Sequence, residues 1–112
     1  MGGRASRRKG HDWEREVAAR FRAVFGENAV RRGLQSRSGE EVPDVEVPCF
    51  WVECKREKRT NPKAALMQAV ASAPKGRIPV AMCKEDRCEP MATLLLDDFL
   101  DLVGEWWQLS KR

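Results

Sequence analysis

The stretch that most constrains this chain is residues 43–55, PDVEVPCFWVECK. Its valine and aromatic residues favour β-strands, and Pro48 with Cys49 stands where a tight turn is needed. The stretch therefore predicts a hairpin of two antiparallel strands, at about 43–47 and 50–56. A turn centred between residues 48 and 49 places Asp44 opposite Glu53.

Alternation along the second predicted strand decides which side chains face the same way. Trp51, Glu53 and Lys55 share one face, and Val52 and Cys54 point the other way, into the core together with the valines of the first strand. Two carboxylates at cross-strand distance repel each other unless a cation lies between them. The pattern predicts a divalent metal site of the oxygen-rich kind that suits Mg²⁺ or Mn²⁺.

A resemblance to a known family starts from these residues. Pro43-Asp44, eight further residues and then Glu53-Cys54-Lys55 resemble the signature of the PD-(D/E)xK nucleases. Gly10 to Glu14 in a preceding predicted helix and Ser38-Gly39 before the hairpin extend the likeness. The whole arrangement is similar to the archaeal-type Holliday junction resolvases, including phage-encoded relatives, and covers about residues 9–85.

The resemblance implies a fold and a set of site residues. The fold is α/β, with a restriction-endonuclease-like αβββαβ core whose central mixed sheet is flanked by helices. The implied metal ligands, for Mg²⁺ or Mn²⁺, are Glu14, Asp44, Glu53 and the backbone carbonyl of Cys54, with Glu16 as the alternative to Glu14. The implied catalytic residues are Glu14, Ser38, Asp44, Glu53 and Lys55. Lys55 would hold the attacking water or stabilise charge on the phosphate, and Gln68, in a later helix, would lie beside the metal.

The same resemblance implies an activity. It is that of a Mg²⁺-dependent endodeoxyribonuclease, a crossover junction resolvase of DNA recombination and repair, which cuts four-way junctions at paired symmetric positions. Two such cuts require two active sites, so a C2 homodimer is expected. Another structure-specific or restriction-type PD-(D/E)xK nuclease is an alternative, although the length of the chain favours the resolvase. A non-catalytic DNA-binding protein is the alternative from another class.

The charge balance also indicates a polyanionic partner. The 112 residues carry a formal net charge of +4, with a sequence pI near 9.1. We expect residues 1–9 to form a flexible basic tail and residues 10–112 to form a single nuclease domain. The residues expected to contact DNA are Arg4, Arg7, Arg8, Lys9, Arg31, Arg37, Lys58 and Arg59.

Periodicity predicts the remaining elements. Helices are expected at 11–25, 62–73 and 97–108, with Asn61-Pro62 as a start signal for the second. Strands are expected at 28–34, 77–83 and 89–96, and a polar turn at 84–87. The third helix carries more apolar surface than a small domain readily covers, so it is either a subunit contact or a packed lid.

Cysteine, histidine and membrane signals complete the prediction. The pairs Cys49/Cys54 and Cys83/Cys88 imitate the spacing of a zinc site, but reduced cysteines that pack as small apolar groups fit the predicted strands better. The single histidine, His11, is interpreted as a polar residue at a helix start. No apolar run is long enough to span a membrane. A cytoplasmic protein is expected, in the host cytoplasm if it is encoded by a phage.

Overall fold

The structure, a computed structural model, describes residues 3–33 and 41–112. A five-stranded mixed sheet, in the order β1-β2-β3-β4-β5, forms the middle layer. The strands are β1 (Arg31–Arg32), β2 (Val45–Glu46), β3 (Phe50–Glu57), β4 (Ile78–Glu85) and β5 (Met91–Thr93). Only the β3–β4 pair is parallel. The α/β class with a central mixed sheet flanked by helices is therefore confirmed.

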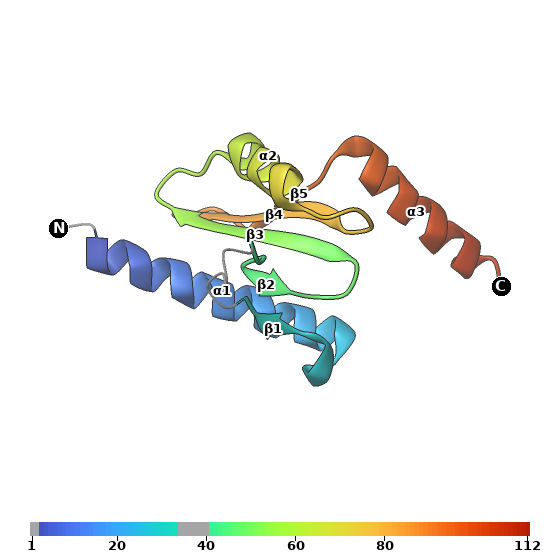
Figure 1. Cartoon of the computed structure of the whole chain (residues 1–112), viewed down its shortest axis with the longest axis horizontal. Coiled ribbons are helices and arrows are strands. Elements are labelled where there is room, and N and C mark those ends of the chain that lie inside the picture. The colour runs from blue at the N-terminus through green and yellow to red at the C-terminus, as the bar shows by residue number, and fades with distance from the viewer. Residues whose placement is uncertain (1–2, 34–40) are drawn as a thin grey trace.

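Two helices cover opposite faces of the sheet. α1 (Gly3–Phe25) packs on β3 from one side, and α2 (Pro62–Ser72) packs on β4 and β3 from the other (Figure 1). α2 is the crossover between the parallel strands β3 and β4, as a parallel pair requires. Its predicted start is confirmed, because the Asn61 side chain accepts a hydrogen bond of 3.1 Å from the backbone N–H of Ala64.

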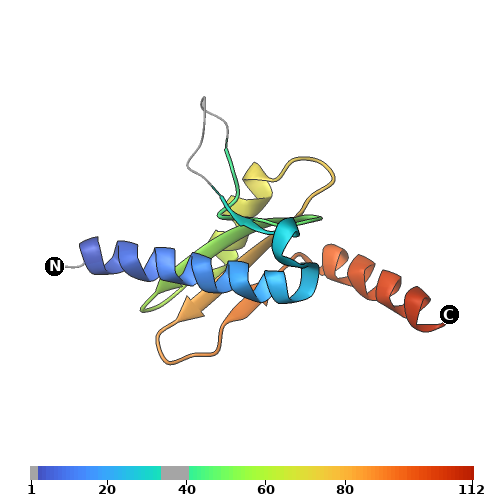
Figure 2. The same cartoon turned by 90° about the horizontal axis from the view of Figure 1, so that it is seen from below.

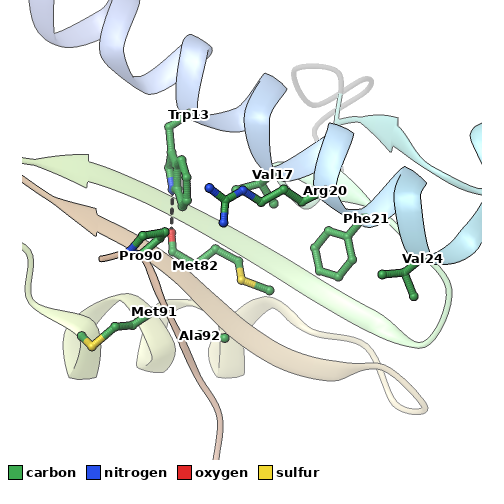
Figure 3. A pocket seen from close by; sticks show the side chains of 9 residues that line it. All are labelled: Trp13, Val17, Arg20, Phe21, Val24, Met82, Pro90, Met91 and Ala92. Carbon is green, nitrogen blue, oxygen red and sulfur yellow. Dashed lines mark hydrogen bonds between the residues drawn. The ribbon is translucent and has the colours of Figure 1, made fainter. Parts of the chain in front are cut away.

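The main core lies between α1 and the sheet. Trp13 and Val17 of α1 are buried against Val45, Val52 and other apolar residues of the strands. The Trp13 indole N–H also donates a hydrogen bond of 2.9 Å to the carbonyl oxygen of Met82 on β4 (Figure 3). This bond fixes α1 across the sheet, because an unpaired indole N–H would be costly to bury.

The predicted hairpin is confirmed, including its register. Val45 pairs with Val52 and Glu46 with Trp51, so the turn centres between residues 48 and 49 as expected. Cys49 adopts φ 63° in this turn, the left-handed conformation that tight turns use. The first strand is much shorter than the predicted 28–34, because Glu27–Ala29 forms a single 3-10 turn before β1.

The largest difference from the prediction is at the N-terminus. Residues 3–9, expected as part of a flexible tail, form the first two turns of α1. The two views show these turns extending past the sheet, so Arg4, Arg7 and Arg8 are presented to solvent on a helix (Figures 1 and 2). The expected irregular conformation of this segment is therefore wrong for the described residues.

The bounds of β4 and β5 also differ from the predicted strands. β4 continues to Glu85, into the segment predicted as a polar turn, because Glu85 pairs with Glu57 at the end of β3. The strand predicted at 89–96 is reduced to β5, and the third helix, α3 (Leu96–Ser110), begins after Leu94 and Leu95. α3 leaves the sheet and points away from both layers (Figures 1 and 2). None of the helices in the described part of the chain is long and apolar enough to cross a membrane.

Candidate metal and phosphate site

A polar groove opens where the two short strands end. β1 stops at Arg32 and β2 starts at Val45, at the same end of an antiparallel pair, so the sheet leaves room there. Side chains from α1 and α2, which cover opposite faces, both reach this opening. The resulting cavity has a volume of about 830 Å³. We call it the acidic groove, after Glu14, Asp44 and Glu53, which line it.

Asp44 and Glu53 lie side by side in the groove, as the register of the hairpin requires. One oxygen of Asp44, Oδ2, accepts a hydrogen bond of 2.8 Å from the backbone N–H of Cys54. This bond ties the Asp44 carboxylate to the neighbouring strand β3. The Glu53 side chain is only 13% exposed, so the two acids are held close together and away from bulk water.

The electrostatics of the pair are unfavourable for negative charge. Burial and the neighbouring Asp44 carboxylate together raise the pKa of Glu53 to about 7, and burial is the larger cause. Burial likewise raises the pKa of Asp44, against the lowering effect of the Cys54 N–H bond. A bound cation would offset both effects, because it favours the ionised form of each acid.

Glu14 and Glu16 separate clearly in the structure. Glu14 lines the acidic groove, whereas Glu16 is exposed and forms an ion pair with Arg20. The Glu14 carboxylate is bound by Arg32, whose guanidinium donates a hydrogen bond of 2.9 Å to Oε1. Glu14 therefore contributes negative charge to the groove while its own carboxylate is already paired.

Lys55 is beside the acids and Cys54 is below them. The Lys55 Nζ atom is 3.8 Å from Oε2 of Glu53. The Cys54 side chain is buried in the main core, so only its backbone atoms face the acids. Gln68 of α2 lines the groove, as expected, and so does Ser72 one turn later.

Several groove residues were not assigned to the site from the sequence, among them His11, Arg32, Glu41 and Trp51. His11 was interpreted as a residue at a helix start, but it lies in the third turn of α1, three positions before Glu14 and on the same side. Arg32, not Arg31, points into the groove, while Arg31 forms an ion pair with Glu46. Trp51 lines the floor, and its alternation with Glu53 along β3 was the signal for it.

Two buried donors in this groove have no partner among residues 3–33 and 41–112. The Nε atom of Arg32 and the Nε1 atom of Trp51 are buried, and neither makes a hydrogen bond to any residue that the structure describes. Both are donors only, so an acceptor such as a phosphate oxygen or a water molecule suits both. A groove that offers a carboxylate pair and unpaired donors fits both a cation and an anion.

The residue set fits a magnesium ion in a particular way. Within residues 3–33 and 41–112, no group of three or more His, Cys, Asp or Glu side chains forms a ready metal site. Mg²⁺ does not need one, since it is commonly bound by one or two carboxylates and keeps several waters. Asp44 and Glu53 supply these two carboxylates, and Glu14 is held away by Arg32.

The remaining predicted residues divide into two groups. Arg4, Arg7, Arg8 and Lys9 are on the exposed first turns of α1, and Lys58 and Arg59 are exposed after β3. The Nζ atom of Lys9 is 3.8 Å from Oδ1 of Asp86, which follows β4. Because β3 and β4 are parallel, Lys58 and Arg59 after β3 lie at this same end of the molecule. Arg37 and Ser38 lie outside the described residues.

The helical period relates these basic residues to the groove. Residues 4, 7, 11 and 14 follow one another at spacings of three and four, which places them on one side of α1. His11 and Glu14 line the acidic groove, so Arg4 and Arg7 continue that side outward. A strand of phosphates entering the groove would pass along this row.

The comparisons with known proteins give no family for the chain. No family model, no curated protein and no solved structure matches it at a significant level. The resemblance described above therefore stands on the residues quoted for it and on their arrangement.

Proposed function

We propose that this chain is a metal-dependent DNA endonuclease of the PD-(D/E)xK type that resolves four-way junctions. The observation that carries the proposal is the adjacency of Asp44 and Glu53, with Lys55 next to them, in a groove that also exposes Glu14 and Gln68. A purely structural role does not account for two carboxylates held together at raised pKa. The αβββαβ order of the elements, with the acids on β3 and just before β2, supports the same assignment.

Each residue has a role in this proposal. Asp44 and Glu53 would hold Mg²⁺ or Mn²⁺, with the Cys54 carbonyl as a further ligand. The metal, when bound, would polarise the scissile phosphate and lower the pKa of a bound water. Lys55 would stabilise the charge that develops on the phosphate.

Two further side chains would orient the phosphate. The donors of Arg32 and Trp51, which have no partner among the described residues, would bind phosphate oxygens in the groove. The row of Arg4 and Arg7 would bind the flanking backbone. Such contacts release counterions, so binding should weaken steeply as the salt concentration rises.

The test is cleavage of a labelled four-way junction beside matched duplex, flap and single-stranded DNA. We expect cuts at symmetric positions on the junction in Mg²⁺ or Mn²⁺ and none in EDTA. Activity in EDTA would contradict the metal mechanism. Equal cutting of junction and duplex would leave a general nuclease, and binding without cutting in any metal would leave a DNA-binding protein.

Variants with matched controls test the assignment of residues. Asp44→Asn, Glu53→Gln and Lys55→Ala should each abolish cleavage while most DNA binding remains. Glu57→Gln is the control on the same strand, because Glu57 is exposed at the end of β3. Near-normal cleavage by any of the first three would mean that its residue is misassigned.

The role of Glu14 on α1 is tested by a substitution with a matched control on the same helix. Glu14→Gln should reduce cleavage, whereas Glu16→Gln, two positions away and outside the groove, should not. Equal effects of the two substitutions would remove Glu14 from the site.

A further inference from the structure

The last helix of the chain presents an apolar side that nothing in the described structure covers. None of the 15 residues of α3, all of which the structure describes, is buried. Phe99, Trp106 and Trp107 are 50%, 64% and 52% exposed, and five aliphatic side chains of Leu95 to Leu109 are exposed beside them. Asp97, Asp101 and Glu105 recur at spacings of four on the other side, with Asp98 next to them, so the helix is amphipathic.

The chain is packed against the core just before α3, whereas no residue of α3 itself is buried. Leu94 is packed against the main core, and Leu95, with φ −68° and ψ 145°, is extended. A single residue therefore separates the anchored Leu94 from the first residue of the helix. At about 1.5 Å per residue, the tryptophan pair lies roughly 15 Å from this anchor, in agreement with the two views in which α3 projects beyond the sheet (Figures 1 and 2).

An apolar groove lies beside the edge strand β5, the strand that α3 follows. It has a cavity volume of about 290 Å³ and runs between α1, β4 and β5 (Figure 3). Phe21, Val24, Met82 and Met91 contribute to it, and Val24 and Met91 are 75% and 54% exposed. Surfaces of this kind, with large apolar side chains beside an edge strand, are typical of contact sites.

The two surfaces match chiefly in polarity. The α3 sequence contains four acidic residues and no Lys or Arg. Arg20 is the one charged residue among those that line the apolar groove, and it forms an ion pair with Glu16 on the same helix (Figure 3). Contact between apolar side chains is therefore the main match, and Arg20 adds a single cation beside the acidic helix.

We propose that α3 of one copy of this chain binds in the apolar groove of a second copy, and the second α3 in the first groove, to form a helix-exchanged dimer. Three aromatic side chains about half exposed offer on the order of 300 Å² per helix. The aliphatic side chains and the groove wall at least double this figure. Two reciprocal contacts then reach the roughly 1,200 Å² at which stable interfaces begin.

Occupation of the groove by the chain's own α3 is the competing arrangement. It would require the helix to turn back over β5, the strand that it follows, within the single residue Leu95. The anchor at Leu94 directs the helix away from the domain instead, toward a neighbour. The exchange also gives a closed C2 assembly, in which both helices are used.

Light scattering and sedimentation over a range of concentrations test the assembly. The wild type should be a dimer. Trp106→Glu with Trp107→Glu should raise the dissociation constant by about 100-fold or more, because central aromatic residues dominate interfaces. Met91→Glu, in the groove, should do the same. Val70→Glu on α2 is the matched control, since Val70 is also exposed but belongs to neither surface, and it should leave the dimer intact.

Cross-linking decides between exchange and folding back. In a background with Cys49→Ser and Cys88→Ser, Val24→Cys and Leu109→Cys chains are mixed and treated with a short bismaleimide. A product of twice the chain mass that needs both variants supports the exchange. A cross-link at single-chain mass in the Val24→Cys, Leu109→Cys double variant would overturn it, as would a wild type that is monomeric at all concentrations.

Circular dichroism tests whether the tryptophan variants remain folded, so that a loss of the dimer is not mistaken for unfolding. α3 contributes no buried residue, so the tryptophan variants should keep the secondary structure of the wild type. The proposal does not depend on nuclease activity. A dimer without junction cleavage would refute the proposed function alone, and cleavage by a monomer would refute the exchange alone.

Discussion

The most direct physical test of the candidate site is the stability of Glu53→Gln as a function of pH. Burial beside Asp44 raises the pKa of Glu53 from 4.5 to about 7. At about 1.4 kcal/mol per pH unit, ionised Glu53 therefore lowers the free energy of unfolding by about 3 kcal/mol. The glutamine variant keeps the shape and loses the charge, so it measures this cost.

The sign follows from proton linkage. Because the pKa is raised in the folded state, Glu53 favours folding fully below pH 4.5, and this contribution is lost as the pH rises through about 7. The glutamine variant should therefore resemble the wild type near pH 4.5 and be more stable at pH 8, by up to about 3 kcal/mol. The neighbouring Asp44 shares the same repulsion, which makes this value an upper bound.

Urea unfolding followed by tryptophan fluorescence, at pH 5 and pH 8 in EDTA, measures the effect. With a slope of about 1–3 kcal/mol per molar urea for small proteins, the midpoint at pH 8 should move up by as much as about 1–3 M. Glu57→Gln, on the exposed end of the same strand, should not move it. An unchanged midpoint for Glu53→Gln at pH 8, or equal shifts at both pH values, would refute the account.

Mg²⁺ should then reverse the order of the two proteins. A ligand that binds only the folded state adds about 4.1 kcal/mol at 1,000 times its dissociation constant, which exceeds the cost of about 3 kcal/mol. At pH 8, Mg²⁺ should raise the midpoint of the wild type and leave that of Glu53→Gln nearly unchanged. Equal stabilisation of both would place the cation elsewhere.

Three further predictions concern the scaffold and the basic row. Gly33→Ala should cost at least about 2 kcal/mol and reduce cleavage, because the new Cβ would lie 1.7 Å from the backbone oxygen of Pro43, next to the site; urea unfolding and the junction assay measure both. Trp13→Phe should cost about 1–2 kcal/mol in urea unfolding, since it leaves the carbonyl of Met82 without the indole donor. Arg7→Ala should lower the slope of log binding constant against log salt by about one; an unchanged slope would remove this residue from the DNA contact.

The centre of the fold was predictable because several local signals agree there. Strand alternation, a turn at Pro48-Cys49 and the polar start of α2 each have a short-range cause. They fix the register of β2 and β3, and with it the adjacency of Asp44 and Glu53. Side chains that a single hairpin positions can therefore be assigned to one site from the sequence.

The rest depended on packing between distant segments. Arg32 and His11 reach the groove because β1 and α1 are brought to the end of the hairpin, and no local pattern distinguishes Arg32 from Arg31. The N-terminal turns of α1 lack an apolar side, but arginine, lysine and alanine are good helix formers. Extension from a helix already fixed by Trp13 avoids the cost of a new nucleus.

The apolar pattern of α3 shows a different limit. Regular spacing of Phe99, Val103 and Trp107 predicted the helix correctly. The same spacing says that one side will be covered, but not by which surface. Among the described residues that side stays exposed, and in the proposed helix exchange the surface that covers it belongs to a second copy of the chain.

Charge balance in the acidic groove links the metal to DNA binding. Glu14, Glu41, Asp44 and Glu53, when ionised, bring four negative charges, and Arg32 and Lys55 bring two positive ones, which leaves two negative charges. On the proposed function, a groove of this sign repels a phosphodiester, and a divalent cation neutralises it. Ca²⁺, which can occupy oxygen sites with less demanding geometry, should therefore strengthen junction binding by the wild type. It should not do so for Glu53→Gln, whose groove lacks one of the two ligands and carries one negative charge fewer. Gel-shift titrations in EDTA and in Ca²⁺ measure the difference, and equal strengthening of both proteins would mean that the cation acts through the DNA rather than through this groove.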